Sequence, residues 1–114
     1  MDLKHLREQA RGRRLEADDR RKQAVRLMEN AATHIGNGNP ETAQAEQAQA
    51  TKLNEAASDL EAQAVKLDAE ANNKEREVKS IEDTQQQLRA EFDQRMNELD
   101  KQKNNLLGSS MSLF

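Results

Sequence analysis

Alanine recurs every seven residues along most of this chain, and no other feature constrains the fold as strongly. Two series have this spacing: Ala10, Ala17, Ala24 and Ala31, and then Ala43, Ala50, Ala57, Ala64 and Ala71. Positions seven apart return to one stripe of an α-helix, and helices that carry such a stripe pair as coiled coils. Alanine in the stripe lets two helix backbones approach closely. The spacing therefore predicts an all-α, alanine-rich coiled coil.

The two series are separated by the segment Gly36-Asn37-Gly38-Asn39-Pro40. Gly36 suits the left-handed position that follows a helix, Asn39 suits an N-cap, and Pro40 suits the first helical position. We therefore predict a first helix over 2–35, a loop over 36–40 and a return into an antiparallel second helix. Because neither glycine nor proline occurs between 41 and 107, the second helix should be long and should project beyond the first.

The position of the loop predicts which residues of the two helices face each other. Its seam should set alanines of one helix against larger residues of the other, with Ala10 opposite Leu67 and Ala17 opposite Leu60. The predicted seam residues are Ala10, Ala17, Ala24, Ala31, Ala50, Ala57, Ala64, Ala71, Leu53, Leu60 and Leu67. Beside the seam, we expect Arg7 to lie near Asp68 and Arg14 near Glu61. Such exposed pairs select the orientation of the helices more than they stabilise them.

Larger apolar residues replace alanine in the second half of the chain. We divide the chain into a hairpin over 2–71, a projecting oligomerisation helix over 72–107 and a short apolar tail over 108–114. The residues expected to bind a partner are Val78, Ile81, Leu88, Phe92, Leu99, Leu106, Leu113 and Phe114. A single amphipathic helix is only marginally stable in water. We therefore predict that 75–107 binds protein, either a second copy in a homo-oligomer or a larger assembly.

Composition argues against a globular enzyme. Charged residues make up 34% of the chain, aromatic residues only 2%, and cysteine is absent. The two histidines, His5 and His34, lie at opposite ends of the first helix without a second ligand at metal-binding spacing. No catalytic or phosphate-binding motif occurs. We therefore expect no catalytic residue, no cofactor and no metal site.

The pattern predicts a non-catalytic structural or assembly subunit that packs through coiled-coil helices. One setting is an internal, neck or scaffold component of a phage or virus particle; another is an adaptor or chaperone of a secretion or cytoskeletal assembly. Nucleic-acid binding is the alternative, through phosphate contacts from Arg7, Arg11, Arg14 and Arg21 in the basic first helix. No apolar run is long enough to span a membrane, and the start lacks the apolar core of a signal peptide, which predicts an intracellular or virion location.

Overall fold

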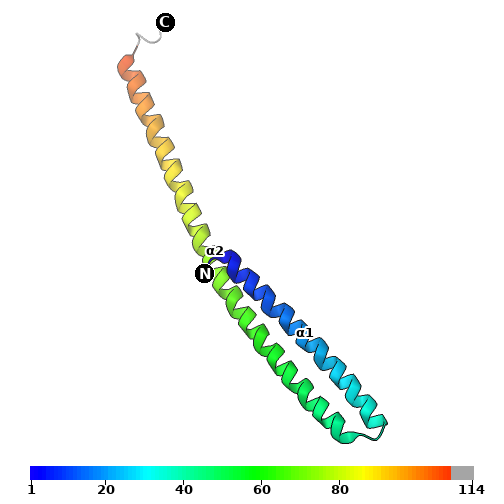
Figure 1. Ribbon diagram of the computed structural model, residues 1–114. Helices are drawn as coiled ribbons and strands as arrows, with labels where there is room; N and C mark the ends of the chain where they lie inside the picture. The colour runs from blue at the N-terminus through cyan, green and yellow to red at the C-terminus, as the bar shows by residue number, and fades with distance from the viewer. Residues whose placement is uncertain (109–114) are drawn as a thin grey trace. The chain divides into compact units, whose positions relative to one another are not determined.

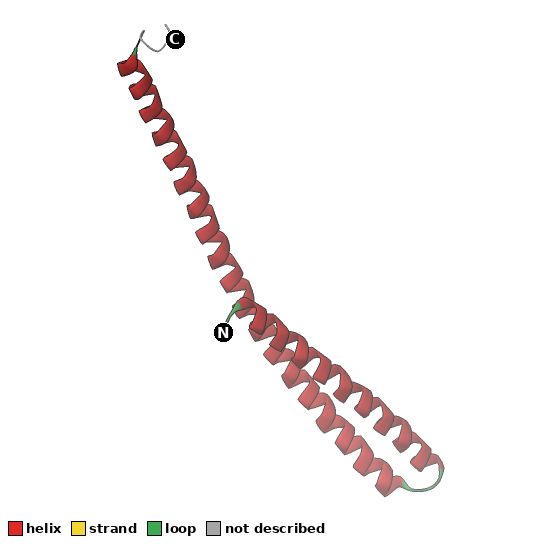
Figure 2. Ribbon diagram, turned by 45° about the horizontal axis from the view of Figure 1, so that its top comes forward, coloured by secondary structure: helices red, strands yellow, loops and turns green. Residues whose placement is uncertain are grey.

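The computed structural model describes residues 1–108, which form two helices and no strand (Figures 1 and 2). Helix α1 spans Leu3–Gly36 and helix α2 spans Pro40–Leu107. The chain divides into one compact unit, Met1–Glu75, and a second that begins at Arg76. The first unit is an antiparallel hairpin, and the predicted all-α hairpin is therefore confirmed. The predicted tail contacts of Leu113 and Phe114 lie outside the described residues.

Asp2 caps the start of α1. Its backbone is extended, and its carboxylate Oδ1 accepts a hydrogen bond of 2.9 Å from the backbone N–H of His5. The same oxygen lies 2.9 Å from the ring Nδ1 of His5. An N-cap carboxylate satisfies one of the first N–H groups of a helix, which have no partner within it. Helix α1 therefore begins at Leu3.

The turn between the helices differs from the predicted one. Gly36 is the last helical residue, and Gly38 takes the left-handed conformation with a φ of 79°. The Gly38 N–H bonds to the Ile35 carbonyl at 3.1 Å, and the Asn39 N–H bonds to the His34 carbonyl at 2.7 Å. These two bonds are those of a Schellman motif. The prediction that Gly36 holds the left-handed position is wrong, because the helical bonding continues through Gly36 and the cap falls on Asn37.

Helix α2 begins where the sequence predicts. Pro40 is its first residue, where a missing N–H removes no helical hydrogen bond. The carbonyl of Asn39 accepts a bond of 3.2 Å from the Ala43 N–H, so Asn39 occupies the N-cap position. Glu41 lies in the first turn and faces the positive end of the helix dipole.

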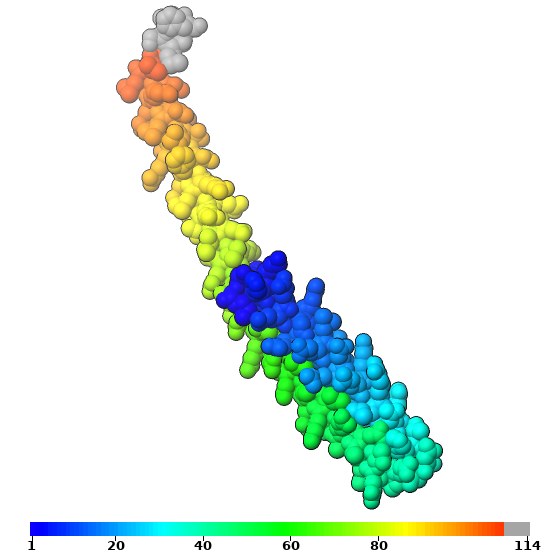
Figure 3. Space-filling model, viewed as in Figure 1, coloured from blue at the N-terminus to red at the C-terminus, as the bar shows by residue number. Residues whose placement is uncertain are grey.

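The buried residues of the hairpin are almost all alanine. Within residues 1–108 the buried side chains are Leu6 and nine alanines: Ala10, Ala17, Ala24, Ala31, Ala43, Ala50, Ala57, Ala64 and Ala71. Leu53, Leu60 and Leu67 are half-buried and border this row. Figure 3 shows side chains of α1 lying directly against the first part of α2. The hairpin core is therefore a row of small methyl groups flanked by leucines.

Candidate functional site

A series of ion pairs joins α1 to α2 along one side of the hairpin. The Arg7 guanidinium lies 2.6 Å from the Glu75 carboxylate, and the Arg21 Nε lies 2.9 Å from the Glu61 carboxylate. Between them, Arg14 is paired with Asp68. Three arginines at seven-residue spacing thus each meet one carboxylate of α2.

These partners are not the predicted ones. The sequence placed Arg7 beside Asp68 and Arg14 beside Glu61, whereas each arginine bonds one heptad further along α2. Side chains of a helix lean toward its N-terminus. In an antiparallel pair, the arginine therefore reaches toward the start of α1, beside which α2 carries its later residues. The carboxylate leans the opposite way and meets it.

The Arg21–Glu61 pair has an electrostatic consequence. The side-chain hydrogen bond from Arg21 lowers the pKa of Glu61, and the same bond raises the pKa of Arg21. An Nη2 of Arg21 also lies 3.5 Å from the Ser58 hydroxyl. The pair is open to solvent, so it orients the helices rather than supplying a reactive carboxylate.

Two polar side chains meet near the turn. His34, in the last turn of α1, hydrogen-bonds through its ring Nδ1 to the carboxylate of Glu46 in α2. Both side chains are partly buried. His34 therefore connects the two helices beside the turn.

Arg13 and Arg20 occupy seam positions of α1, where a long side chain can lie over alanine and extend its charged end to water. Arg20 is exposed as expected. Arg13 is half-buried, and its Nε atom is buried without a hydrogen-bond partner. The Nε of Arg13 therefore lies inside the seam, while the side chain as a whole is half-buried.

The second unit carries an uncovered apolar stripe on α2. Every residue from 75 to 108 is exposed. The predicted partner-binding residues in this range are Val78, Ile81, Leu88, Phe92, Leu99 and Leu106, with exposed fractions from 46% to 88%. They recur at steps of three, four and seven, as the buried residues of the hairpin do. We call this set the α2 stripe.

Met96 and Leu107 were missed by the sequence analysis. Both are large, apolar and exposed. Met96 lies between Phe92 and Leu99 in the chain and directly follows a core position of the heptad. It therefore widens the α2 stripe there. The signal for Met96 in the sequence was an apolar residue next to a seam position. The prediction missed it because it considered the seam positions alone.

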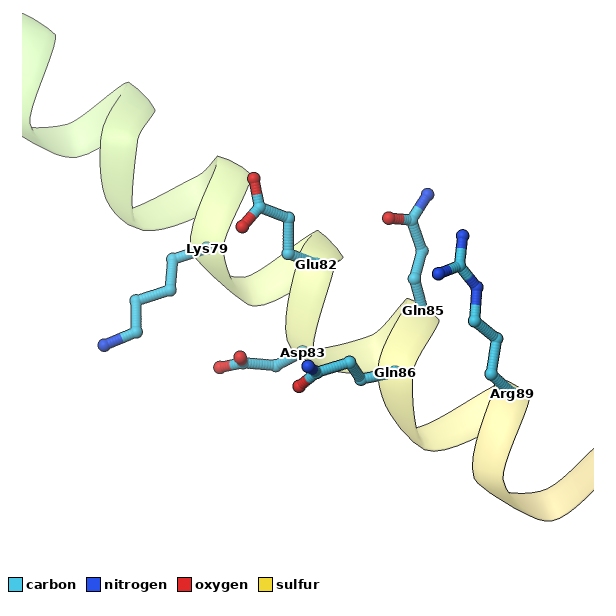
Figure 4. Close-up of a pocket in the computed structure, with 6 residues that line it drawn as sticks. All are labelled: Lys79, Glu82, Asp83, Gln85, Gln86 and Arg89. Atoms are coloured by element: carbon cyan, nitrogen blue, oxygen red, sulfur yellow. The ribbon is translucent and has the colours of Figure 1, made fainter.

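Polar residues interrupt the α2 stripe at three of its heptad positions: Gln85, Arg95 and Gln102. A hollow beside Gln85 is lined by Lys79, Glu82, Asp83, Gln85, Gln86 and Arg89 (Figure 4). All six side chains come from this one helix, and they spread away from it in different directions. The hollow is an open helix surface and brings no reactive groups together.

The candidate phosphate-binding arginines fall into two groups. Arg7, Arg14 and Arg21 bond to carboxylates of α2, as described above. Arg11 is exposed and takes part in no ion pair within residues 1–108. The hairpin thus pairs three of the four arginines that the sequence offers as candidate phosphate contacts.

Within residues 1–108, no cluster of three or more His, Cys, Asp or Glu side chains is arranged to hold a metal ion. The same part of the chain contains no helix that is both long and apolar enough to cross a membrane. No protein-family model, curated protein or solved structure matches this chain.

Proposed function

We propose that this protein is a non-catalytic assembly subunit that binds helices of a protein partner through the α2 stripe. The observation that carries the proposal is a contrast within one helix. In the hairpin, the heptad positions of α2 that carry alanine are buried against α1. Beyond Glu75, most core heptad positions of the same helix carry larger apolar residues, and these residues are exposed.

The energetics favour a covered stripe. Burying a Val, Leu, Ile or Phe side chain contributes about 1.5–3 kcal/mol relative to leaving it in water. A helix without tertiary packing is marginal, because most helical stability in proteins comes from its apolar face. A partner helix would therefore stabilise residues 76–107 and hide the stripe at the same time.

The proposed settings are those in which small helical subunits pack side by side. One is an internal, neck or scaffold position in a phage or virus particle. The other is an adaptor or chaperone position in a secretion or cytoskeletal assembly. The α2 stripe would contact the partner in each of these settings. The two helices of the hairpin would remain packed against each other.

The proposal is tested by the size of the native complex that contains the chain. In extracts of the source cells or particles, the wild-type chain should migrate in a complex larger than the free chain. Leu88→Asp places a charge in the α2 stripe and should release the chain from that complex. Gln87→Asp, one residue away and outside the stripe, is the matched control and should leave the complex intact. A complex that retains the Leu88→Asp chain as well as the wild-type chain would refute the proposal.

The nucleic-acid alternative gains no support from the described residues. Three of the four arginines named for phosphate contact are ion-paired within the hairpin. Binding that depends on phosphate neutralisation needs cationic groups free to replace counterions. We therefore do not put it forward as a second function.

A further inference from the structure

We propose that the occupant of the α2 stripe is a second copy of this chain, paired antiparallel to the first over residues 76–107. The inference rests on the proposed function, because it names the partner of the same surface. It also fixes a register, in which Gln85 of one copy faces Arg95 of the other. Three observations carry it: the exposed apolar residues, the polar residues among them, and the charges at their sides.

Four of the six apolar residues of the α2 stripe match one another when the helix is reversed. The core positions of a heptad are its first and its fourth. In antiparallel coiled coils, the first position of one helix lies opposite the fourth position of the other. The register that sets Leu88 opposite Phe92 also sets Ile81 opposite Leu99. All four side chains are more than half exposed in the single chain. Each match occurs twice in the pair, so that register would cover all four residues in both copies.

The polar residues within the stripe distinguish antiparallel from parallel pairing. In the antiparallel register, the Arg95 guanidinium of one copy lies beside the Gln85 amide of the other, whose carbonyl oxygen accepts its hydrogen bond. In a parallel pair, Arg95 would face Arg95 in the seam. Two like charges at one partly buried layer are unfavourable, because each loses hydration without gaining a counterion. The polar residues therefore favour the antiparallel pair.

The flanking charges favour the same arrangement. The ion pairs of the hairpin show which flanking residues meet when two antiparallel helices share this seam, as Arg7 and Glu75 do. Applied to two copies of 76–107, the same offset brings Glu82 beside Lys103 of the second copy, twice per pair. In a parallel pair, Glu82 would instead lie beside Glu77 of the second copy. At Glu82, the antiparallel pair therefore gains two attractions where the parallel pair has two repulsions.

The overall charge of the segment permits self-association. Residues 76–107 contain six Lys or Arg and seven Asp or Glu, which leaves a net charge of −1. Two copies therefore meet with almost no net repulsion.

The first test exchanges the flanking charges in the full chain. Sedimentation equilibrium should give the wild type a mass that rises with concentration toward twice the 12.9 kDa of one chain. Glu82→Lys should raise the dissociation constant of the pair about tenfold, because two attractions become two repulsions. Adding Lys103→Glu to Glu82→Lys should restore wild-type association. A parallel pair would respond to Glu82→Lys in the opposite direction, by tightening, and that result would overturn the inference.

The second test reads the register by disulfide formation, which is simple because the chain has no cysteine of its own. Full-length Ile81→Cys and Leu99→Cys chains should form a mixed disulfide-linked pair when combined and oxidised, and neither should link to itself. Self-linked pairs of each variant would show parallel packing. Absence of the mixed link, with circular dichroism confirming helicity, would exclude the proposed register.

The failures of the two proposals are distinguishable. If the wild type stays monomeric at every concentration, or if the cysteine variants link only to themselves, the antiparallel self-pair is wrong. The proposed function still stands in that event if Leu88→Asp, but not Gln87→Asp, releases the chain from its native complex. If Leu88→Asp has no such effect, the proposed function fails, whichever way the charge variants behave.

Discussion

Individual alanines set how closely the two helices of the hairpin lie. Ala57 is fully buried, while Ala62 on the same helix is exposed. A side chain larger than a methyl group at Ala57 has no space unless α1 moves away. Inserting extra carbon atoms into a packed core typically costs about 1–3 kcal/mol. The small residues of the core are thus a requirement of the packing and not only a reflection of helix propensity.

We predict that Ala57→Leu lowers the free energy of unfolding of the hairpin by about 1–3 kcal/mol. Ala62→Leu is the matched control and should change it little, because leucine and alanine are both good helix formers at an exposed position. Urea unfolding followed by circular dichroism gives both values. Equal effects of the two substitutions would contradict a closely packed methyl row.

A second residue-scale prediction concerns pH at the start of α1. The hydrogen bond from the backbone N–H of His5 lowers the pKa of Asp2 below its ordinary value of 3.8. The side-chain hydrogen bond to Asp2 raises the pKa of His5 above its ordinary value of 6.5. The Asp2 contribution is therefore present above pH 3.8 and is lost as the pH falls through the lowered pKa. The His5 contribution is present below pH 6.5 and is lost as the pH rises through the raised pKa.

The first turn of α1 should accordingly be most helical between about pH 4 and 6.5. Backbone chemical shifts of residues 3–6, followed by NMR across this range, measure the effect directly. Asp2→Ala removes both interactions and should flatten the profile. A profile that keeps its shape in Asp2→Ala would show that another group controls this turn.

At the scale of the elements, the two helices are joined by a turn whose geometry depends on one glycine. Gly38 has a φ of 79°, in the left-handed region where a side chain is strained. We predict that Gly38→Ala lowers the free energy of unfolding by about 1–2 kcal/mol. Urea unfolding measures it. An unchanged midpoint would mean that the turn adopts another conformation without cost.

Gly12 offers the opposite case within α1. It lies in the helix interior, and an added Cβ would meet nothing within 4 Å outside the local helix backbone. Gly12→Ala should therefore raise the free energy of unfolding by about 0.5–1 kcal/mol, because alanine loses less backbone entropy in a helix. The same urea experiment compares Gly12→Ala with Gly38→Ala. If both substitutions changed the free energy of unfolding in the same direction, the contrast between the two glycines would be refuted.

The elements also show how far the sequence predicts the fold. Heptad spacing is a property of each helix alone, so the seam residues and the start at Pro40 could be inferred from the chain. The ion-pair partners depend on the direction in which side chains lean, which is why Arg7 was assigned to Asp68 and not to Glu75. The residue at which the first helix ends depends on which carbonyls accept hydrogen bonds from the N–H groups of the turn. The spacing of Gly36 and Gly38 does not show which of the two glycines takes the left-handed conformation.

At the scale of the whole molecule, the exposed stripe predicts that helix stability depends on association. Residues 76–107 should exchange their amide hydrogens faster in dilute solution than at high concentration, because pairing protects them. Residues 3–71 should exchange at a rate that does not depend on concentration, since their partner belongs to the same chain. Hydrogen–deuterium exchange mass spectrometry at two concentrations separates these cases. Equal protection of 76–107 at both concentrations would contradict association through this segment.

The candidate site was predictable in part at this scale. The run from Val78 to Leu106 could be recognised because its spacing continues the alanine columns with larger residues. Met96 was missed because it lies beside those columns, although its place next to a seam position was a signal in the sequence. The sequence predicted that arginines of the first helix meet carboxylates of the second, but not which carboxylate each arginine meets.

The uniformity of the hairpin core has a consequence for how the chain tolerates change in length. Successive layers of this core repeat almost identically, so an insertion of seven residues in one arm would present equivalent methyl groups to the other arm. An insertion of one residue would instead rotate the following alanines away from the seam. The turn, with Gly38 at its bend and His34 bonded to Glu46 beside it, marks one end of this series of layers. A few residues at the turn therefore fix the register of the two helices at that end of the hairpin.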